Sequence, residues 1–137
     1  MLQYDKSWIV REEAVVALGV KGLEGARETL LARVSQDAAW QVSCAAAVSL
    51  GKTRDPKAVE SLVPFLAAKD WRMRGAAAAG VGWANQVESI PPLIPLLADA
   101  EPCVARTAWE FLKRLADKDL PMKPKDWEAI VAANNGG

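Results

Sequence analysis

The stretch that decides the fold is Trp40-Gln41-Val42, followed by Leu50-Gly51, because the chain repeats it. It returns 31 residues later as Trp71-Arg72-Met73 with Val81-Gly82, and it stands 32 residues earlier as Trp8-Ile9-Val10 with Leu18-Gly19. A weaker copy follows as Pro102-Cys103-Val104 with Leu112-Lys113. A period of this length is typical of a small helical unit that cannot bury its apolar face alone and stacks on copies of itself.

Each unit predicts two helices. In the first helix, apolar or small residues recur at i, i+4, i+7 and i+8, which is one helical face. These core sets are Val10, Ala14, Ala17 and Leu18; Val42, Ala46, Ser49 and Leu50; Met73, Ala77, Gly80 and Val81; and Val104, Ala108, Phe111 and Leu112. The matching sets of the second helix are Ala26, Leu30 and Val34; Ala58, Leu62 and Leu66; and Ser89, Leu93 and Leu97.

Recurrent residues also predict where the helices begin, end and bend. Asp37, Asp70 and Asp99 precede three of the first helices and are expected to cap their free N–H groups. Gly19, Gly51 and Gly82 are expected to end these helices as left-handed C′ residues and to act as hinges. Pro64 and Pro95 share one repeat position, where a proline removes an internal hydrogen bond, so both second helices should bend there.

The pattern Asp-x-x-Trp-x-Val-Arg-x-x-Ala … Ala-Leu-Gly, followed by Ala-x-x-x-Leu-x-Pro-Leu-Leu-x-Asp, resembles HEAT repeats. It is most similar to the short HEAT-like class named after phycobilisome lyases. The arginine of that pattern is present as Arg11 and Arg74 but replaced by Ser43 and Ala105. The resemblance implies an all-α solenoid of about four stacked hairpins in a right-handed superhelix, used for binding. The expected repeats are 5–36, 37–69, 70–98 and 99–117, followed by a loop and capping helix over 118–137.

Composition narrows the classes of function. Seventeen basic and seventeen acidic residues cancel, which disfavours nucleic acid as a partner. The sequence offers no candidate membrane span or leader pattern, and its two cysteines fit no metal spacing. We therefore expect a cytoplasmic protein with reduced thiols and no metal or cofactor. Histidine is absent, which removes the commonest general base, so the sequence favours a non-catalytic protein.

A candidate binding surface follows from the helical face opposite the core. In the resembling solenoids the first helices line the concave side, where this chain would place tryptophans beside small residues. Tryptophan is enriched at binding hot spots, so we expect a protein or peptide partner. The candidate contact residues are Trp8, Trp40, Cys44, Val48, Trp71, Arg72, Gly75, Arg106 and Trp109, with Ala47, Ala78 and the helix-ending glycines on the same face.

Alternatives remain open from the sequence. Trp8, Trp40 and Trp71 could instead pack between repeats, and Trp83 and Trp127 are assigned to packing. The small residues could instead allow neighbouring helices to pack closely, and the charged side chains could form an ordinary solvent-exposed face. Two other HEAT-like classes are alternatives: DNA alkylation-repair glycosylases, which use a concave aromatic cleft with a carboxylate, and accessory subunits of bilin lyases. The neutral net charge argues against the glycosylases.

The amino-terminal end of the repeat array has its own expectation. The first unit begins with its first helix, so no preceding second helix covers it. Three explanations fit this uncovered face of the first helix: another molecule covers it, the chain is a fragment, or Leu2 and Tyr4 fold back over it. An uncovered apolar face together with an apolar groove predicts self-association into a homo-oligomer.

Overall fold

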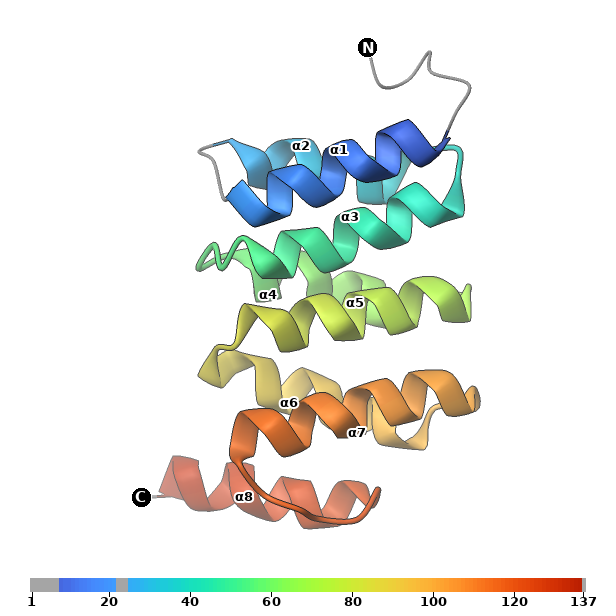
Figure 1. Ribbon diagram of the computed structural model, residues 1–137. Helices are drawn as coiled ribbons and strands as arrows, with labels where there is room; N and C mark the ends of the chain where they lie inside the picture. Colours follow the sequence, from blue (N-terminus) through green and yellow to red (C-terminus); the bar gives the residue numbers. More distant parts are fainter. Residues whose placement is uncertain (1–7, 22–24, 137) are drawn as a thin grey trace.

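A computed structural model describes residues 8–21 and 25–136, and every regular element in these ranges is helical. A front layer stacks the first helices of the units in sequence order: α1 (Trp8–Lys21), α3 (Trp40–Lys52), α5 (Trp71–Ala84) and α7 (Pro102–Ala116) (Figure 1). A rear layer holds α2 (Ala26–Gln36), α4 (Ala58–Leu62), α6 (Ile90–Leu93) and α8 (Pro124–Gly136). The expected all-α solenoid is confirmed.

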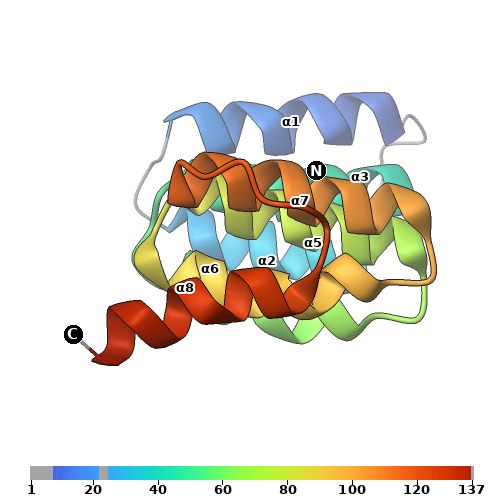
Figure 2. The same ribbon diagram turned by 90° about the horizontal axis from the view of Figure 1, so that it is seen from below.

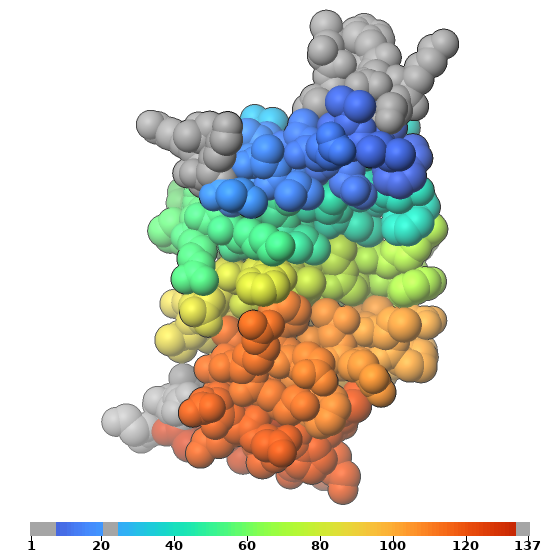
Figure 3. All heavy atoms as spheres, in the orientation of Figure 1, coloured from blue at the N-terminus to red at the C-terminus, as the bar shows by residue number. Residues whose placement is uncertain are grey.

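The front layer forms one continuous face, with its residues in successive bands along the stack (Figure 3). Helix α3 packs between α1 and α5, and α5 packs between α3 and α7. Seen along the stack, the first helices form a curved row in which α1 and α7 lie forward of α5 (Figure 2).

The two prolines divide the rear helices at one repeat position. After Leu62, α4 continues as the 3₁₀ segment η2 (Val63–Ala67), with Pro64 in its first turn. After Leu93, α6 continues as η4 (Ile94–Ala98), with Pro95 in the same place. A further short 3₁₀ turn, η3 (Val87–Ser89), precedes α6. The expected bend is therefore a switch from α to 3₁₀ hydrogen bonding.

Burial confirms the predicted core in the rear helices and in most of the front helices. All nine rear-helix positions of the predicted sets are buried. In the front layer, Val42, Leu50 and Val81 are fully buried, as are Val104 and Leu112 in α7. The predictions fail in α1, where Val10 is 48% exposed, Ala17 is exposed and the buried apolar side chain is that of Val15.

The exposure of α1 follows from how the units stack. Each later first helix packs on the rear helix of the preceding unit: α3 on α2, α5 on α4 and η2, and α7 on α6 and η4. Among the described residues, α1 has no such neighbour, so Ile9, Val10 and Val20 lie exposed. Leu2 and Tyr4, which could cover this face, lie outside the described residues. Self-association through it stays a prediction.

The recurrent glycines do not end the front helices, which corrects the sequence-based expectation. Gly19, Gly51 and Gly82 lie inside their helices, and the left-handed residues come three positions after Gly51 and Gly82, at Arg54 and Asn85. Asp117 plays the same part after α7. A Cβ built on Gly51 would overlap the carbonyl oxygen of Gly80, and one on Gly82 would overlap the Phe111 ring. These glycines let neighbouring helices approach closely. Ala47 and Ala78, expected on the groove, are likewise fully buried between the front helices.

Of the three aspartates predicted to cap front helices, only Asp70 does so, accepting the backbone N–H of Arg72 in the first turn of α5 at 2.9 Å. Asp37 and Asp99 instead accept the N–H groups of Ala39 and Glu101, the residues directly before α3 and α7, at 2.9 Å. These two aspartates also bind the arginine of the preceding unit. Arg11 donates to Asp37 at 3.1 and 3.2 Å, and Arg74 donates to Asp99 at 2.8 and 3.0 Å. These pairs fasten consecutive units together.

Candidate functional site

The front face holds an apolar hollow of about 300 Å³. We call it the tryptophan hollow; it is lined by Trp40 and Cys44 of α3, Trp71, Arg72, Gly75 and Ala76 of α5, and Cys103, Val104 and Thr107 of α7. Five of these residues are among the predicted contacts, and the structure brings all five into one site. The four lining residues missed from sequence are Ala76 and the three from α7. Cys103 could have been found by carrying the repeat one unit further, since it aligns with Arg72. Thr107 aligns with Ala76, which was itself missed, and Val104 was predicted for the core.

The two indoles stand in the first turns of their helices. Trp40 is 46% exposed and Trp71 is 43% exposed, so neither ring is packed away between the units. Each occupies the position that directly follows a helix cap, where the backbone has not yet turned its side chains into the core. Large aromatic surface exposed at the rim of a concavity is typical of interaction sites.

Arg72 forms part of the wall between the two tryptophans. Its guanidinium donates to both carboxylate oxygens of Asp70, the shortest contact being 2.8 Å from Nη2 to Oδ2. Its Cζ also lies 4.2 Å from the centroid of the Trp40 ring, a cation–π contact that links α5 to α3. The hydrogen bonds from the side chain and backbone N–H of Arg72 hold the pKa of Asp70 below its usual value. The arginine is therefore held in place over Trp40.

This arrangement exists because one unit departs from the repeat. In the units with Arg11 and Arg74, the arginine binds the next aspartate, whose side chain is 1% or 8% exposed. Ser43 replaces that arginine in the second unit and donates instead to the Arg33 carbonyl at 3.2 Å. The third unit also lacks the aspartate that such an arginine would bind, because Ala68 stands at the position of Asp37 and Asp99. Asp70 stands two residues later, is 41% exposed and pairs with Arg72 of its own helix.

Small residues form the floor of the tryptophan hollow. A Cβ built on Gly75 would meet only Val104 Cγ2, at 3.8 Å, which is an ordinary van der Waals contact. Gly75 is therefore not required for helix packing, unlike Gly51 or Gly82. Its missing side chain leaves space that faces the hollow, which a bound group can enter.

A family model for HEAT repeats matches residues 1–82, more than half of the chain. The chain belongs to the HEAT-repeat family. A comparison with curated proteins gave no match. HEAT repeats generally serve as protein-interaction scaffolds and are typically non-catalytic. Among the described residues of this HEAT-repeat protein, no helix is long and apolar enough to cross a membrane.

The other predicted contact residues lie outside the tryptophan hollow. Trp8, Val48 and Arg106 are not among its lining residues. Trp109 is half-buried, donates from Nε1 to the Leu120 carbonyl at 2.6 Å and lies under Lys113 Nζ, 3.6 Å from its ring centroid. It therefore fastens the segment between α7 and α8. The expected packing role of Trp127 is confirmed, since its ring is fully buried.

The two cysteines of the HEAT-repeat array provide a direct probe of the hollow. Burial raises the pKa of the Cys44 thiol, the charge of Asp70 raises it further, and Arg72 partly offsets this. Cys103 is exposed. Because the thiolate is the reactive form, we expect a maleimide at pH 7 to modify Cys103 faster than Cys44. Intact-mass analysis of Cys44→Ser and Cys103→Ser variants measures the two rates separately. Faster reaction of Cys44 would contradict this description of the hollow.

Proposed function

We propose that this HEAT-repeat protein is a non-catalytic scaffold that binds a peptide segment of another protein through the tryptophan hollow. The observation that carries the proposal is the exposure of Trp40 and Trp71 around a small-residue floor. A hollow of about 300 Å³ is at the lower end of the range for small-molecule sites. This size suits one large side chain of a partner better than a whole cofactor.

The chemistry of the lining supports binding by burial of apolar surface. Two indoles and the Cβ-free Gly75 offer contact area, while Arg72 is already bound to Asp70 and fixes the orientation of Trp40. A large apolar or aromatic side chain that enters between the rings would lose most of its contact with water. Complete burial of such a side chain contributes roughly 1.5–3 kcal/mol.

The proposal is tested with a displayed library of random 12-residue peptides, selected on the wild-type protein. We expect the enriched peptides to share a large apolar residue. Replacing Trp71 with alanine should weaken their binding by at least about 2 kcal/mol, roughly 30-fold, as truncation of a hot-spot residue does. Its free energy of unfolding should change by no more than about 1 kcal/mol, because the residue is 43% exposed and stands in the first turn of α5.

Two further variants control this test. Gly75→Leu fills the hollow without a backbone clash and should abolish peptide binding while the protein stays folded. Trp109→Ala removes the bond to Leu120 outside the hollow, so it should lower thermal stability and leave peptide affinity unchanged. Normal peptide binding by Gly75→Leu would show that the hollow is not the site. A large loss of stability in Trp71→Ala would show that the ring is structural.

A further inference from the structure

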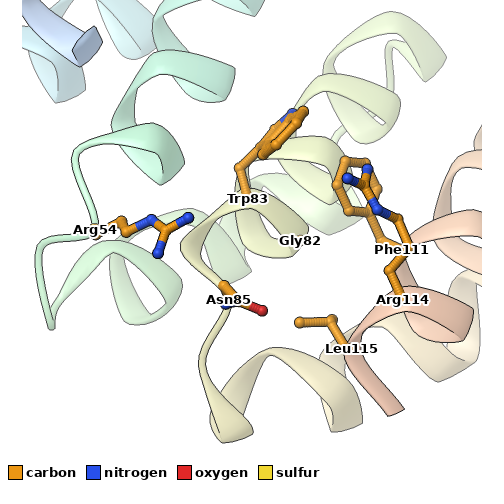
Figure 4. A pocket seen from close by; sticks show the side chains of 7 residues that line it. All are labelled: Arg54, Gly82, Trp83, Asn85, Phe111, Arg114 and Leu115. Atoms are coloured by element: carbon orange, nitrogen blue, oxygen red, sulfur yellow. The ribbon is translucent and has the colours of Figure 1, made fainter. Parts of the chain in front are cut away.

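A second hollow, of about 230 Å³, lies at the opposite ends of the same helices. We call it the cationic hollow; it is lined by Arg54, Gly82, Trp83, Asn85, Phe111, Arg114 and Leu115 (Figure 4). The guanidinium of Arg54 points toward its centre from the segment after α3, and the Asn85 amide points in from the end of α5. The tryptophan hollow lies between the first turns of α3, α5 and α7, and the cationic hollow lies near their last turns.

Two positively charged side chains lie close to the Trp83 ring. Lys52, Trp83 and Arg114 occupy one repeat position, 31 residues apart. Lys52 Nζ lies 5.0 Å from the Trp83 ring centroid, and Arg114 Cζ lies 5.2 Å from it. Phe111 completes the cluster, with its ring edge-on to Trp83 at 5.6 Å. The Trp83 indole therefore holds two cationic side chains in place through cation–π contacts. Because the indole carries no net charge, it neutralises neither of them.

Within residues 8–21 and 25–136, no carboxylate forms an ion pair with Lys52, Arg54 or Arg114. Nearby acids have other partners: Asp55 pairs with Arg27, and Glu110 pairs with Lys113. The two arginines that line the hollow, and Lys52 beside its Trp83 wall, thus have no counter-charge nearby in the described part of the chain, although the basic and acidic residues of the whole chain are equal in number.

The backbone that carries Arg54 adopts an unfavourable conformation. Its φ is +58°, in the left-handed region that costs a non-glycine residue roughly 1–2 kcal/mol. Neighbouring bonds hold the turn: Arg54 N donates to the Gly51 carbonyl at 3.1 Å, and Thr53 Oγ1 donates to the Leu50 carbonyl at 2.6 Å. The turn directs the Arg54 side chain into the hollow, which Arg114 also lines.

The two hollows share one face of the front helices. On α5, Arg72, Ala76 and Trp83 follow the spacing i, i+4 and i+11, which keeps them on one side of the helix. Cys103, Thr107 and Arg114 repeat that spacing on α7. The α5 lining residues of the cationic hollow are centred about ten residues beyond those of the tryptophan hollow, which is about 15 Å along the helix. Roughly four residues of extended chain cover that distance.

We propose that the cationic hollow binds an acidic side chain of the same extended peptide whose apolar side chain enters the tryptophan hollow. This inference rests on the proposed function and adds a partner motif: a large apolar residue and an Asp or Glu about four residues away. Side chains four apart in an extended chain point to the same side, so both reach the protein together. Arginine forks bind carboxylates with paired hydrogen bonds, and this hollow is small enough to suit one such group.

The experiment uses the same 12-residue library, selected in parallel on the wild type and on three double variants. Arg54→Gln with Arg114→Gln removes two cations from the hollow, whereas Arg54→Lys with Arg114→Lys keeps their charge. Lys118→Gln with Lys125→Gln is the charge-matched control, because both lysines are exposed and neither lines either hollow. Circular dichroism checks that each variant is folded. The best wild-type peptide is then synthesised with its acidic residue and as the matched Gln peptide.

The expected result is an acidic preference at about four residues from the apolar one, present in the wild type, the lysine variant and the control. The Gln peptide should bind the wild type at least about fivefold more weakly, and the difference should shrink as salt is added. The glutamine variant should bind both peptides equally. Apolar peptides without acidic preference, or a preference that survives in the glutamine variant, would overturn this inference alone. Enrichment of no peptide would overturn the proposed function, and this inference with it.

Discussion

Replacing Asp37 with alanine is expected to destabilise the protein by about 3–5 kcal/mol, the usual effect of removing one partner of a buried ion pair. The Asp37 side chain is 1% exposed and lies against two guanidinium groups, Arg11 at 3.1 Å and Arg33 at 3.6 Å. Without the carboxylate, Arg11, whose side chain is 9% exposed, would lose both hydrogen bonds to Asp37. Urea unfolding followed by circular dichroism at pH 7 measures the change.

The control is Asp70→Ala, which removes the carboxylate that directly precedes the next front helix. Asp70 is 41% exposed and its partner Arg72 is 37% exposed, so this pair contributes little beyond the cap. We expect a loss of about 1 kcal/mol, as for an N-cap residue. Equal losses for the two variants would show that the Arg11–Asp37 pair does not fasten the units as described.

The same pair sets a pH dependence. Burial alone would raise the pKa of Asp37, but hydrogen bonds from Arg11 and Ala39 and the charges of Arg11 and Arg33 outweigh it. The pKa in the folded protein is therefore below the usual 3.8. A lowered folded-state pKa stabilises the protein above the unfolded-state value, and this stabilisation is lost as pH falls through the folded value. The difference between wild type and Asp37→Ala should accordingly be constant above about pH 5 and shrink below 3.8.

Replacing Gly80 with alanine should destabilise the protein by at least about 2 kcal/mol, although alanine is the better helix former. A Cβ there would overlap the Ala47 carbonyl oxygen and lie 2.7 Å from Leu62 Cδ1. Backbone atoms cannot move aside as a side chain can, so α3 and α5 must separate. Thermal and urea unfolding give the size of the loss.

Gly75→Ala is the matched control for Gly80→Ala, five residues away on the same helix. Its Cβ would meet only Val104 Cγ2 at 3.8 Å, so the helix-forming tendency of alanine should prevail. We expect no loss of stability and up to about 1 kcal/mol of gain. Destabilisation of both variants by the same amount would mean that close approach between α3 and α5 is not what requires Gly80.

Sequence periodicity predicted the parts of the fold that depend on local pattern. The rear-helix sets were right throughout, because their residues face the front layer in every unit. From the second unit onward the first-helix sets were right except at Met73 and Phe111, which are half-buried, and in the first unit they were wrong at Val10 and Ala17. Burial at those positions depends on the rear helix of a preceding unit, which the α1 sequence itself does not encode.

The glycines and the binding site show a second limit of prediction from sequence. A glycine near a helix end fits either a left-handed cap or a close helix contact, and only the neighbouring helix decides between them. The tryptophan hollow was half predicted, because Trp40 and Trp71 are repeat equivalents whereas Trp109 aligns with the buried Ala78. The cationic hollow was missed, although Lys, Trp and Arg at one repeat position were a usable signal.

The glycine contacts also determine how the solenoid can flex. Where Gly51 meets Gly80, backbone lies directly on backbone, and no side chain is available to change rotamer as the helices tilt. Between α5 and α7 the contact includes the large Phe111 side chain on Gly82, and this junction is less extensive than the one between α3 and α5. Elastic compliance should therefore concentrate at the α5–α7 junction, which both hollows adjoin. The helices up to α5 would then move as one rigid body relative to α7, and a bound partner would change the curvature of the solenoid at the α5–α7 junction alone.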